Sequence, residues 1–250
     1  MRFHPLPLLC TLPLATLMLC ACGTHAGEAL ATEPGQVTGI VLDTRNEPVV
    51  GAAVLLESRL FRASYLRGTT GKDGSYRIKA QPGAWDAKAS ITRNYHGKTY
   101  TLNLQPDNTD TFSDEGAVRN FVWKLEGRTP GNEYGYYGGF IQLSLGIDFD
   151  GGLEDITLTL TPDGPLIDGS TGKTLHLRLG DHYWVDPYQI EDIPIGRYTV
   201  EATLRNGDGE RPPKIQDWHT KGAFQRPFQL DFMPKSPLGV DNSASIVIGD

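Results

Sequence analysis

The sequence predicts an all-β fold made of two antiparallel β-sandwich domains, and three observations support this prediction. Apolar and polar residues alternate over many short runs, which is the pattern of strands with one buried and one solvated face. The 250 residues include 29 glycines and 17 prolines, which favour turns over long helices. A chain of this length has room for two domains of ordinary size.

The charge and the cysteine positions exclude several classes of function. The net charge is -7 and no stripe of Lys or Arg is present, so we expect no nucleic-acid binding. An acidic surface is also repelled by anionic lipid, so attachment to a membrane has to be hydrophobic or covalent. All three cysteines lie within the first 22 residues. The rest of the chain therefore has no disulfide, no cysteine-based zinc site and no thiol nucleophile.

Residues 1–21 have the pattern of a bacterial lipoprotein signal peptide. A weakly positive start precedes an apolar run, Leu6 to Leu19, which is too short and too rich in proline to span a membrane. The run ends in Leu19-Cys20-Ala21-Cys22-Gly23, which resembles the bacterial lipobox. This resemblance implies cleavage before Cys22 and its acylation. The alternative is an ordinary secretory peptide that is cleaved near Ala26 or Ala31.

The predicted anchor places the protein in the bacterial cell envelope. Several acyl chains on Cys22 would hold the chain on a bilayer far more firmly than a single chain does. Gly23 in the position after the cysteine resembles the signal for sorting to the outer membrane. Residues 22–34 are small, polar and without pattern, which predicts a flexible tether.

We expect the first domain to span residues 35–127. Its strands are predicted from alternating apolar residues around Val37 to Val41, Ala52 to Leu56 and Trp85 to Ile91, and from further runs at 99–104 and 118–125. Between the second and third of these, Gly71-Lys72-Asp73-Gly74 predicts the turn of a tight hairpin, in which glycine supplies a positive φ.

Four segments of this domain resemble the carboxypeptidase regulatory-like domain. They are Gly39–Asp43, Glu47–Val54, Thr69–Ile78 and Pro82–Trp85. Their shared pattern is G-x-V-x-D, P-V-x-G-A-x-V, T-D-x-x-G-x-Y and P-G-x-Y, with Gly71 in place of the usual Asp and Trp85 in place of the usual Tyr. The resemblance implies a transthyretin-like, carbohydrate-binding-like sandwich that serves as an accessory module and not as an enzyme.

A linker and a second sandwich are expected to follow. Residues 128–139 are rich in Gly and Tyr, which marks a boundary, and residues 140–250 return to alternation. The predicted strands are carried by three runs of alternating apolar residues: Ile141, Leu143, Leu145 and Ile147; Ile156, Leu158 and Leu160; Leu175, Leu177 and Leu179. The segment 193–202 weakly repeats the pattern around Trp85, which favours a second sandwich of related type.

Two groups of residues are candidate binding sites. The carboxylates Asp148, Asp150, Glu154 and Asp155 gather in a Gly-bearing loop and are the ligand type that Ca²⁺ prefers, although a solvated acidic loop has the same composition. Aromatic residues outside clean alternation can stack on sugar rings or contact a peptide, or they can fill the space between the domains. These aromatic residues are Tyr134, Tyr136, Tyr137, Trp184 and Trp218.

The sequence contains no recognisable catalytic constellation. His25 and Glu28 spell a zinc-carboxypeptidase motif but fall in the tether, and His176 alternates with buried positions and should face outward. We therefore predict a non-catalytic, lipid-anchored binding or structural module of the envelope, without a cofactor unless the acidic loop holds Ca²⁺. Its expected partners are the membrane and a glycan or an envelope protein. The alternative is an envelope hydrolase, either a glycosidase or a peptidase-like enzyme, with an unrecognised carboxylate site.

Overall fold

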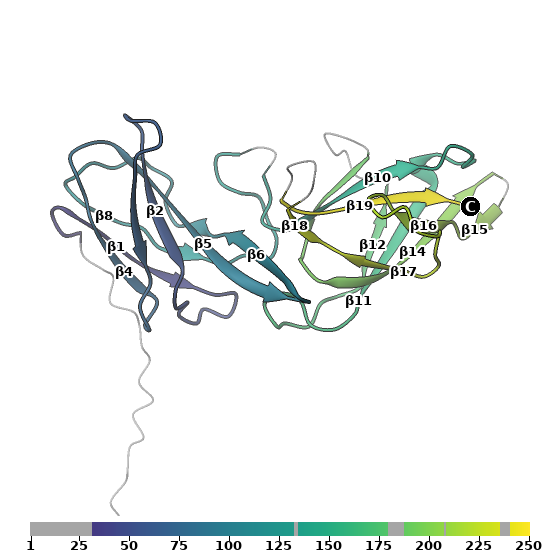
Figure 1. Ribbon diagram of the computed structural model, residues 1–250, viewed down its shortest axis with the longest axis horizontal. Helices are drawn as coiled ribbons and strands as arrows, with labels where there is room; N and C mark the ends of the chain where they lie inside the picture. The colour runs from purple at the N-terminus through teal and green to yellow at the C-terminus, as the bar shows by residue number, and fades with distance from the viewer. Residues whose placement is uncertain (1–31, 133–134, 180–187, 208, 236–240) are drawn as a thin grey trace, which may run out of the picture.

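The computed structural model describes residues 32–132, 135–179, 188–207, 209–235 and 241–250. Its regular elements are strands, apart from one short 3-10 helix, η1 (Leu153–Asp155), which confirms the all-β prediction. Figure 1 shows two bodies end to end, which we call the N-terminal sandwich (β1 to β9) and the C-terminal sandwich (β10 to β19). Within these ranges, no helix has the length and hydrophobicity needed to cross a bilayer.

The N-terminal sandwich consists of two sheets. One has the order β4-β1-β9-β7 with β8 beside β1, and the other has the order β3-β2-β5-β6. The strands are β1 (Gln36–Leu42), β2 (Ala53–Ser58), β3 (Tyr65–Thr69), β4 (Ser75–Lys79), β5 (Trp85–Tyr95), β6 (Lys98–Asn103), β7 (Gln105–Pro106), β8 (Ala117–Val118) and β9 (Phe121–Val122). The alternation read from the sequence holds here, because Val37, Val54 and Ile91 are all buried in the core.

The prediction of a hairpin around Gly71 to Gly74 is wrong. The turn lies where the sequence predicts it, with Gly74 at a φ of 73°, but β3 and β4 do not pair with one another. β3 pairs with β2 and β4 pairs with β1, so the turn passes from one sheet to the other. A Cβ at Gly68 of β3 would lie 2.7 Å from the Ile78 side chain of β4. The two strands therefore pack face to face, with Ile78 in the space that Gly68 leaves.

The C-terminal sandwich also consists of two sheets. One has the order β13-β10-β19-β16 with β18 beside β19, and the other has the order β12-β11-β14-β15 with β17 beside β14. The strands are β10 (Gly139–Leu145), β11 (Ile156–Pro162), β12 (Leu175–Arg178), β13 (Gln189–Ile193), β14 (Arg197–Asn206), β15 (Gly209–Arg211), β16 (Lys214–Asp217), β17 (Phe228–Asp231), β18 (Met233–Lys235) and β19 (Asp241–Gly249). Ile156, Leu158 and Leu160 are fully buried, as their alternation predicts.

Two details depart from the expected pattern. β1 pairs in parallel with β8 and β9, and β10 pairs in parallel with β19, whereas the other ladders are antiparallel.

Ile147 was expected to continue the buried row of β10 but is fully exposed. The strand ends at Leu145, and the amide of Phe149 then donates to the carbonyl of Gly146 at 3.1 Å. This turn carries Ile147 out of the sheet.

The hairpin of β5 and β6 joins the two sandwiches. The Tyr95 hydroxyl donates to the carbonyl of Pro165 at 2.8 Å and accepts from the amide of Arg197 at 3.0 Å. The carbonyl of Phe232 accepts from the Tyr100 hydroxyl at 2.7 Å and from the Lys98 ammonium at 3.0 Å. One apolar core runs through both sandwiches, so side chains as well as hydrogen bonds hold them together.

The segment expected to be a linker is packed at both of its ends. The amide of Gly127 donates to the Asp192 carboxylate at 2.8 Å, and Tyr137 is buried. A Cβ at Gly139 would lie 2.6 Å from the Phe232 ring, which means that this glycine serves close packing. Gly138, whose Cβ would lie 2.6 Å from the backbone of Asp192, and Gly139 therefore bring the end of this segment close to the C-terminal sandwich.

Candidate ligand-binding site

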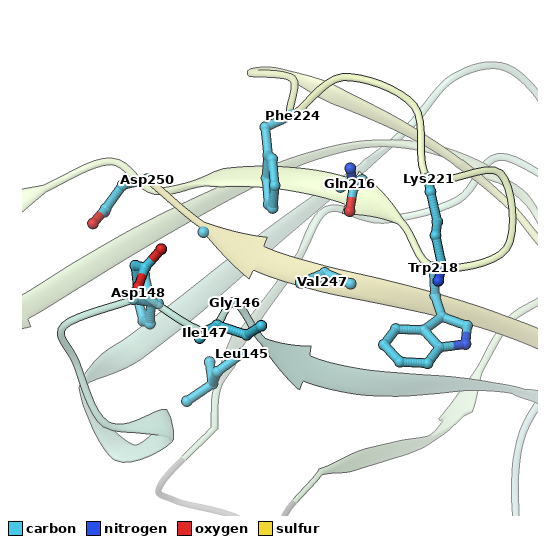
Figure 2. A pocket seen from close by; sticks show the side chains of 12 residues that line it. Leu145, Gly146, Ile147, Asp148, Gln216, Trp218, Lys221, Phe224, Val247 and Asp250 are labelled. Carbon is cyan, nitrogen blue, oxygen red and sulfur yellow. The ribbon is translucent and has the colours of Figure 1, made fainter.

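A recess of about 460 Å³ lies at the end of the C-terminal sandwich that points away from the N-terminal sandwich (Figures 1 and 2). We call it the distal recess. Figure 2 shows Phe224, Trp218 and Ile147 arranged around Val247 of β19. Trp218 is 44% exposed and Ile147 is fully exposed. The recess thus carries large apolar side chains that the core does not use.

The loop after β16 positions Trp218 over the outer face of the sheet. The amide of Trp218 donates to the carbonyl of Ser245 at 3.0 Å, which fixes the start of the loop against β19. The Asp217 carboxylate accepts from the amides of His219 and Thr220 at 2.9 and 2.7 Å. The amide of Lys221 donates to the Asp217 carbonyl at 3.0 Å and closes the turn. The backbone that presents Trp218 is therefore well ordered by its own hydrogen bonds.

Glycine at the end of β19 makes room for the second ring. A Cβ at Gly249 would lie 2.6 Å from the Phe224 ring, so that ring rests directly on the backbone of the strand. The segment of Phe224 is held by Gln225, which exchanges backbone hydrogen bonds with Ile215 of β16 at 2.8 and 2.9 Å. Phe224 thereby forms a fixed wall of the distal recess.

Two charged side chains of the recess have no counter-ion among the described residues. The Lys221 ammonium lies 5.6 Å from the centre of the Trp218 ring and makes no ion pair with a described residue. The Asp148 carboxylate makes neither a hydrogen bond nor an ion pair with a described residue. Asp250, by contrast, pairs with Arg211. The recess therefore offers aromatic rings together with a carboxylate and an ammonium group that have no counter-ion among the described residues, a combination that suits a small polar ligand with apolar faces.

Of the five aromatic residues predicted to bind a ligand, the structure places only Trp218 in this recess. Tyr136 and Tyr137 line a different hollow beside the N-terminal sandwich. There Tyr136 stacks with the Arg128 guanidinium at 4.9 Å, and burial raises the pKa of Tyr137 to about 12. Tyr134 and Trp184 lie outside the described residues. Among the residues that the structure describes, Trp218 therefore lies in a different hollow from Tyr136 and Tyr137.

The four carboxylates predicted to hold Ca²⁺ are not gathered into one site. No group of three or more His, Cys, Asp or Glu in the described part of the chain is placed to hold a metal ion. Asp148 lines the distal recess, whereas Asp155 lines a separate hollow with Thr157 of β11. Asp150 and Glu154 line neither. The turn after Gly146 and the helix η1 separate Asp148 from Glu154 and Asp155 along this loop.

The sequence did not predict Ile147, Lys221 and Phe224 as site residues. Ile147 was assigned to the core because it continues an alternating row, and Lys221 and Phe224 lie in a loop without periodicity. The sequence did single out two other residues of the recess, Trp218 as an aromatic residue outside alternation and Asp148 as part of an acidic loop. Cys22 and the motif of His25 and Glu28 lie outside the described residues.

The carboxyl groups with shifted pKa values do not have the property that a general acid requires. Such an acid needs a raised pKa, but each shifted carboxyl in the described ranges has a lowered pKa. These groups are Glu33, Asp43, Asp73, Asp168 and Asp231. His176 is exposed, as expected, and its ring lies 3.2 Å from the Thr159 hydroxyl. None of these groups supports the hydrolase alternative.

Comparison with known proteins assigns no family. No protein-family model matches the sequence, and no curated protein matches it. Among solved structures, the chain resembles the Bacillus anthracis TIE protein (TM-score 0.35, 12% identity), covering 86% of this chain and 34% of that one. It also resembles the B1 repeat of the collagen-binding surface protein of Staphylococcus aureus (TM-score 0.24, 10% identity), and the match covers 88% of this chain and 98% of that one.

A third similar structure is the major pilin subunit BcpA of Bacillus cereus (TM-score 0.24, 9% identity), and the match covers 86% of this chain and 99% of that one. The chain spans about a third of the length of the TIE protein chain, the first of these. TM-scores below 0.5 and identities near 10% give neither a family nor a function. The resemblance of residues 36–93 to the carboxypeptidase regulatory-like domain stays a prediction.

Proposed function

We propose that this protein is a non-catalytic, lipid-anchored module of the bacterial cell envelope whose distal recess binds a glycan. The observation that carries this proposal is that one recess holds both an exposed Trp218 and the Asp148 carboxylate, which has no ion pair among the described residues. Sugar rings present C–H faces that stack on indole, and their hydroxyls donate to carboxylates. The volume of about 460 Å³ falls within the usual range for small-ligand sites.

The order of the loops around Trp218 supports a binding role over a structural one. Hydrogen bonds from the Trp218 amide to Ser245 and within the following turn fix the backbone that carries the indole before a ligand arrives. A preformed site loses less conformational entropy on binding than a mobile one. Trp85 and Trp123, which pack in the core, are 3% and 4% exposed, whereas Trp218 is 44% exposed.

Binding is tested by titrating the purified protein with soluble envelope oligosaccharides selected on a glycan array. We expect Trp218→Ala to weaken binding about tenfold, which corresponds to about 1.4 kcal/mol. The matched control is Tyr65→Ala, because Tyr65 is 36% exposed and also has a cation, Arg67, over its ring at 5.3 Å. The proposal is wrong if no glycan binds, or if both variants bind like the wild type.

The anchor is tested separately by fractionating cells. Cys22→Ser should move the protein from the membrane to the soluble fraction, because each buried CH₂ of an acyl chain contributes about 0.8 kcal/mol to membrane binding. The intact mass of the amino-terminal peptide should show acyl chains on Cys22. Membrane retention of the variant, together with an unmodified Cys22, would count against the anchor. Separating inner and outer membranes then tests the proposed sorting to the outer membrane.

A further inference from the structure

The loop between β2 and β3 carries two adjacent exposed apolar side chains that the core does not use. Leu60 is 64% exposed and Phe61 is 66% exposed, and arginines flank them at positions 59 and 62. We call Arg59-Leu60-Phe61-Arg62 the 59–62 tip. Contiguous exposed apolar side chains that are rimmed by polar residues are a feature of protein and membrane contact surfaces.

Local hydrogen bonds hold the tip in one conformation. The Ser58 hydroxyl accepts from the amides of Leu60 and Phe61 at 3.2 and 3.1 Å. The amide of Ser58 donates to the carbonyl of Ser64 at 2.9 Å, which closes the base of the loop. The backbone is thus tied back to β2, and the two apolar side chains project into solvent.

The tip is basic, although the whole chain has a net charge of -7. Arg62 has no acidic partner among the described residues, and the nearby Arg67 stacks on Tyr65. Arg59 lies 3.4 Å from Asp86, but its side chain remains 63% exposed. Apolar side chains flanked by cations match the membrane–water interface, where acyl chains lie beneath anionic headgroups.

The tip lies at the end of the N-terminal sandwich where the chain leaves for its amino terminus. The amide of Arg59 donates to the carbonyl of Ala84 at 2.8 Å, and the amide of Ala80 donates to the carbonyl of Gly35 at 2.9 Å. The short connection from β4 to β5 therefore borders both the tip and residue 35. The opposite end of β5 carries Tyr95, which contacts the C-terminal sandwich (Figure 1).

We propose that the 59–62 tip inserts into the interface of an anionic bilayer and thereby orients the protein, with the distal recess pointing away from the membrane. This inference rests on the proposed anchor at Cys22, which brings the tip to the bilayer. The chain from Cys22 to Gly35 reaches roughly 45 Å when extended at about 3.5 Å per residue, so it leaves the tip free to dock.

The test uses the anchored protein on vesicles of phosphatidylglycerol and phosphatidylcholine. Phe61→Cys is labelled with an environment-sensitive dye, and Ile147→Cys, exposed at the far end of the molecule, is the matched control. The dye at residue 61 should shift to shorter wavelength and be quenched by lipids brominated in their acyl chains. The dye at residue 147 should do neither. Equal behaviour of the two dyes would overturn the proposal.

The charge contribution is tested with Arg62→Glu in the Phe61→Cys background. Quenching at residue 61 should fall in this variant, and it should also fall on vesicles of phosphatidylcholine alone, since cations at the tip attract anionic headgroups. Quenching that is unaffected by both changes would contradict the proposed anionic interface. Residues 61 and 62 are exposed and outside the core, so these changes leave the fold intact.

The mass of the amino-terminal peptide separates the two proposals. An unacylated Cys22 would refute the anchor and leave the tip to be judged on its own. In that case the same two dyes are compared in a Cys22→Ser background on sedimented anionic vesicles. Quenching at residue 61 alone would support the tip, and its absence would refute the tip without reference to the anchor.

Discussion

Replacing Tyr100 by Phe removes a single oxygen atom from the junction of the two sandwiches. The Tyr100 side chain is 2% exposed, and its hydroxyl donates to the carbonyl of Phe232 at 2.7 Å. The variant leaves the ring in place, so no cavity larger than the hydroxyl forms. We therefore expect the change in the free energy of unfolding to report the hydrogen bond itself.

The expected change in the free energy of unfolding depends on a second donor to the same carbonyl. The Lys98 ammonium remains 3.0 Å from the Phe232 oxygen, so Tyr100→Phe leaves the acceptor paired and should cost about 1 kcal/mol. Lys98→Met alone should cost a similar amount for the same reason. The double variant leaves a buried carbonyl without a donor, which adds about 1 kcal/mol or more to the sum of the two single changes.

Urea unfolding at equilibrium, followed by circular dichroism, measures the four proteins of this cycle. Tyr65→Phe is the control, because the Tyr65 hydroxyl makes no hydrogen bond among the described residues, and it should leave stability unchanged. All variants should unfold in one transition, since a single core joins the sandwiches. If the two single changes are strictly additive, Tyr100 and Lys98 do not share the Phe232 carbonyl as an acceptor. If the protein unfolds in two separate transitions, the junction between the sandwiches is not rigid.

Two further predictions concern the core and the effect of pH. Trp85→Ala should cost about 3 to 5 kcal/mol, because the ring is 3% exposed and its Nε1 donates to the Gln81 carbonyl at 2.8 Å; an unchanged melting temperature would remove it from the core. Burial alone raises the pKa of Asp231, but the hydrogen bonds from Arg197 and the charges of Lys98 and Arg197 outweigh it and lower that pKa. A group whose pKa is lowered by folding stabilises the fold at pH values above its unfolded pKa of about 4, and this stabilisation is lost as the pH falls through the folded pKa. Asp231→Asn should therefore be less stable than the wild type at neutral pH and equally stable in strong acid; a constant difference across this range in urea unfolding would contradict the assignment.

Period-two alternation predicts the strands well where both ends of a run stay in one sheet. Val37 and Val41 in β1, and Ile156 to Leu160 in β11, are buried as their spacing indicates. The same signal fails at Ile147, because Gly146 starts a turn one residue earlier. Alternation also says nothing about which strands pair, so the turn at Gly71 looked like a hairpin although its two strands belong to different sheets.

The candidate site was only partly predictable, because its residues come together through loops. Trp218 stood out as an aromatic residue outside alternation, and Asp148 stood out as part of an acidic loop. Nothing local indicates that these two residues share one recess. They line the same recess because β19 pairs with β10, which leads to Asp148, and with β16, which leads to Trp218. Such contacts between distant segments leave no periodic trace in the sequence.

Oxidative footprinting of Trp218 is the most direct test of the central claim that the distal recess binds a glycan. Trp218 is 44% exposed, whereas Trp85 and Trp123 are 3% and 4% exposed and serve as internal references. Mass spectrometry of the proteolytic peptides, after oxidation of the protein with and without a saturating oligosaccharide, should show that the ligand slows oxidation at residue 218 and leaves the references unchanged. Equal oxidation of Trp218 in both samples, under conditions where the oligosaccharide is bound, would contradict the account.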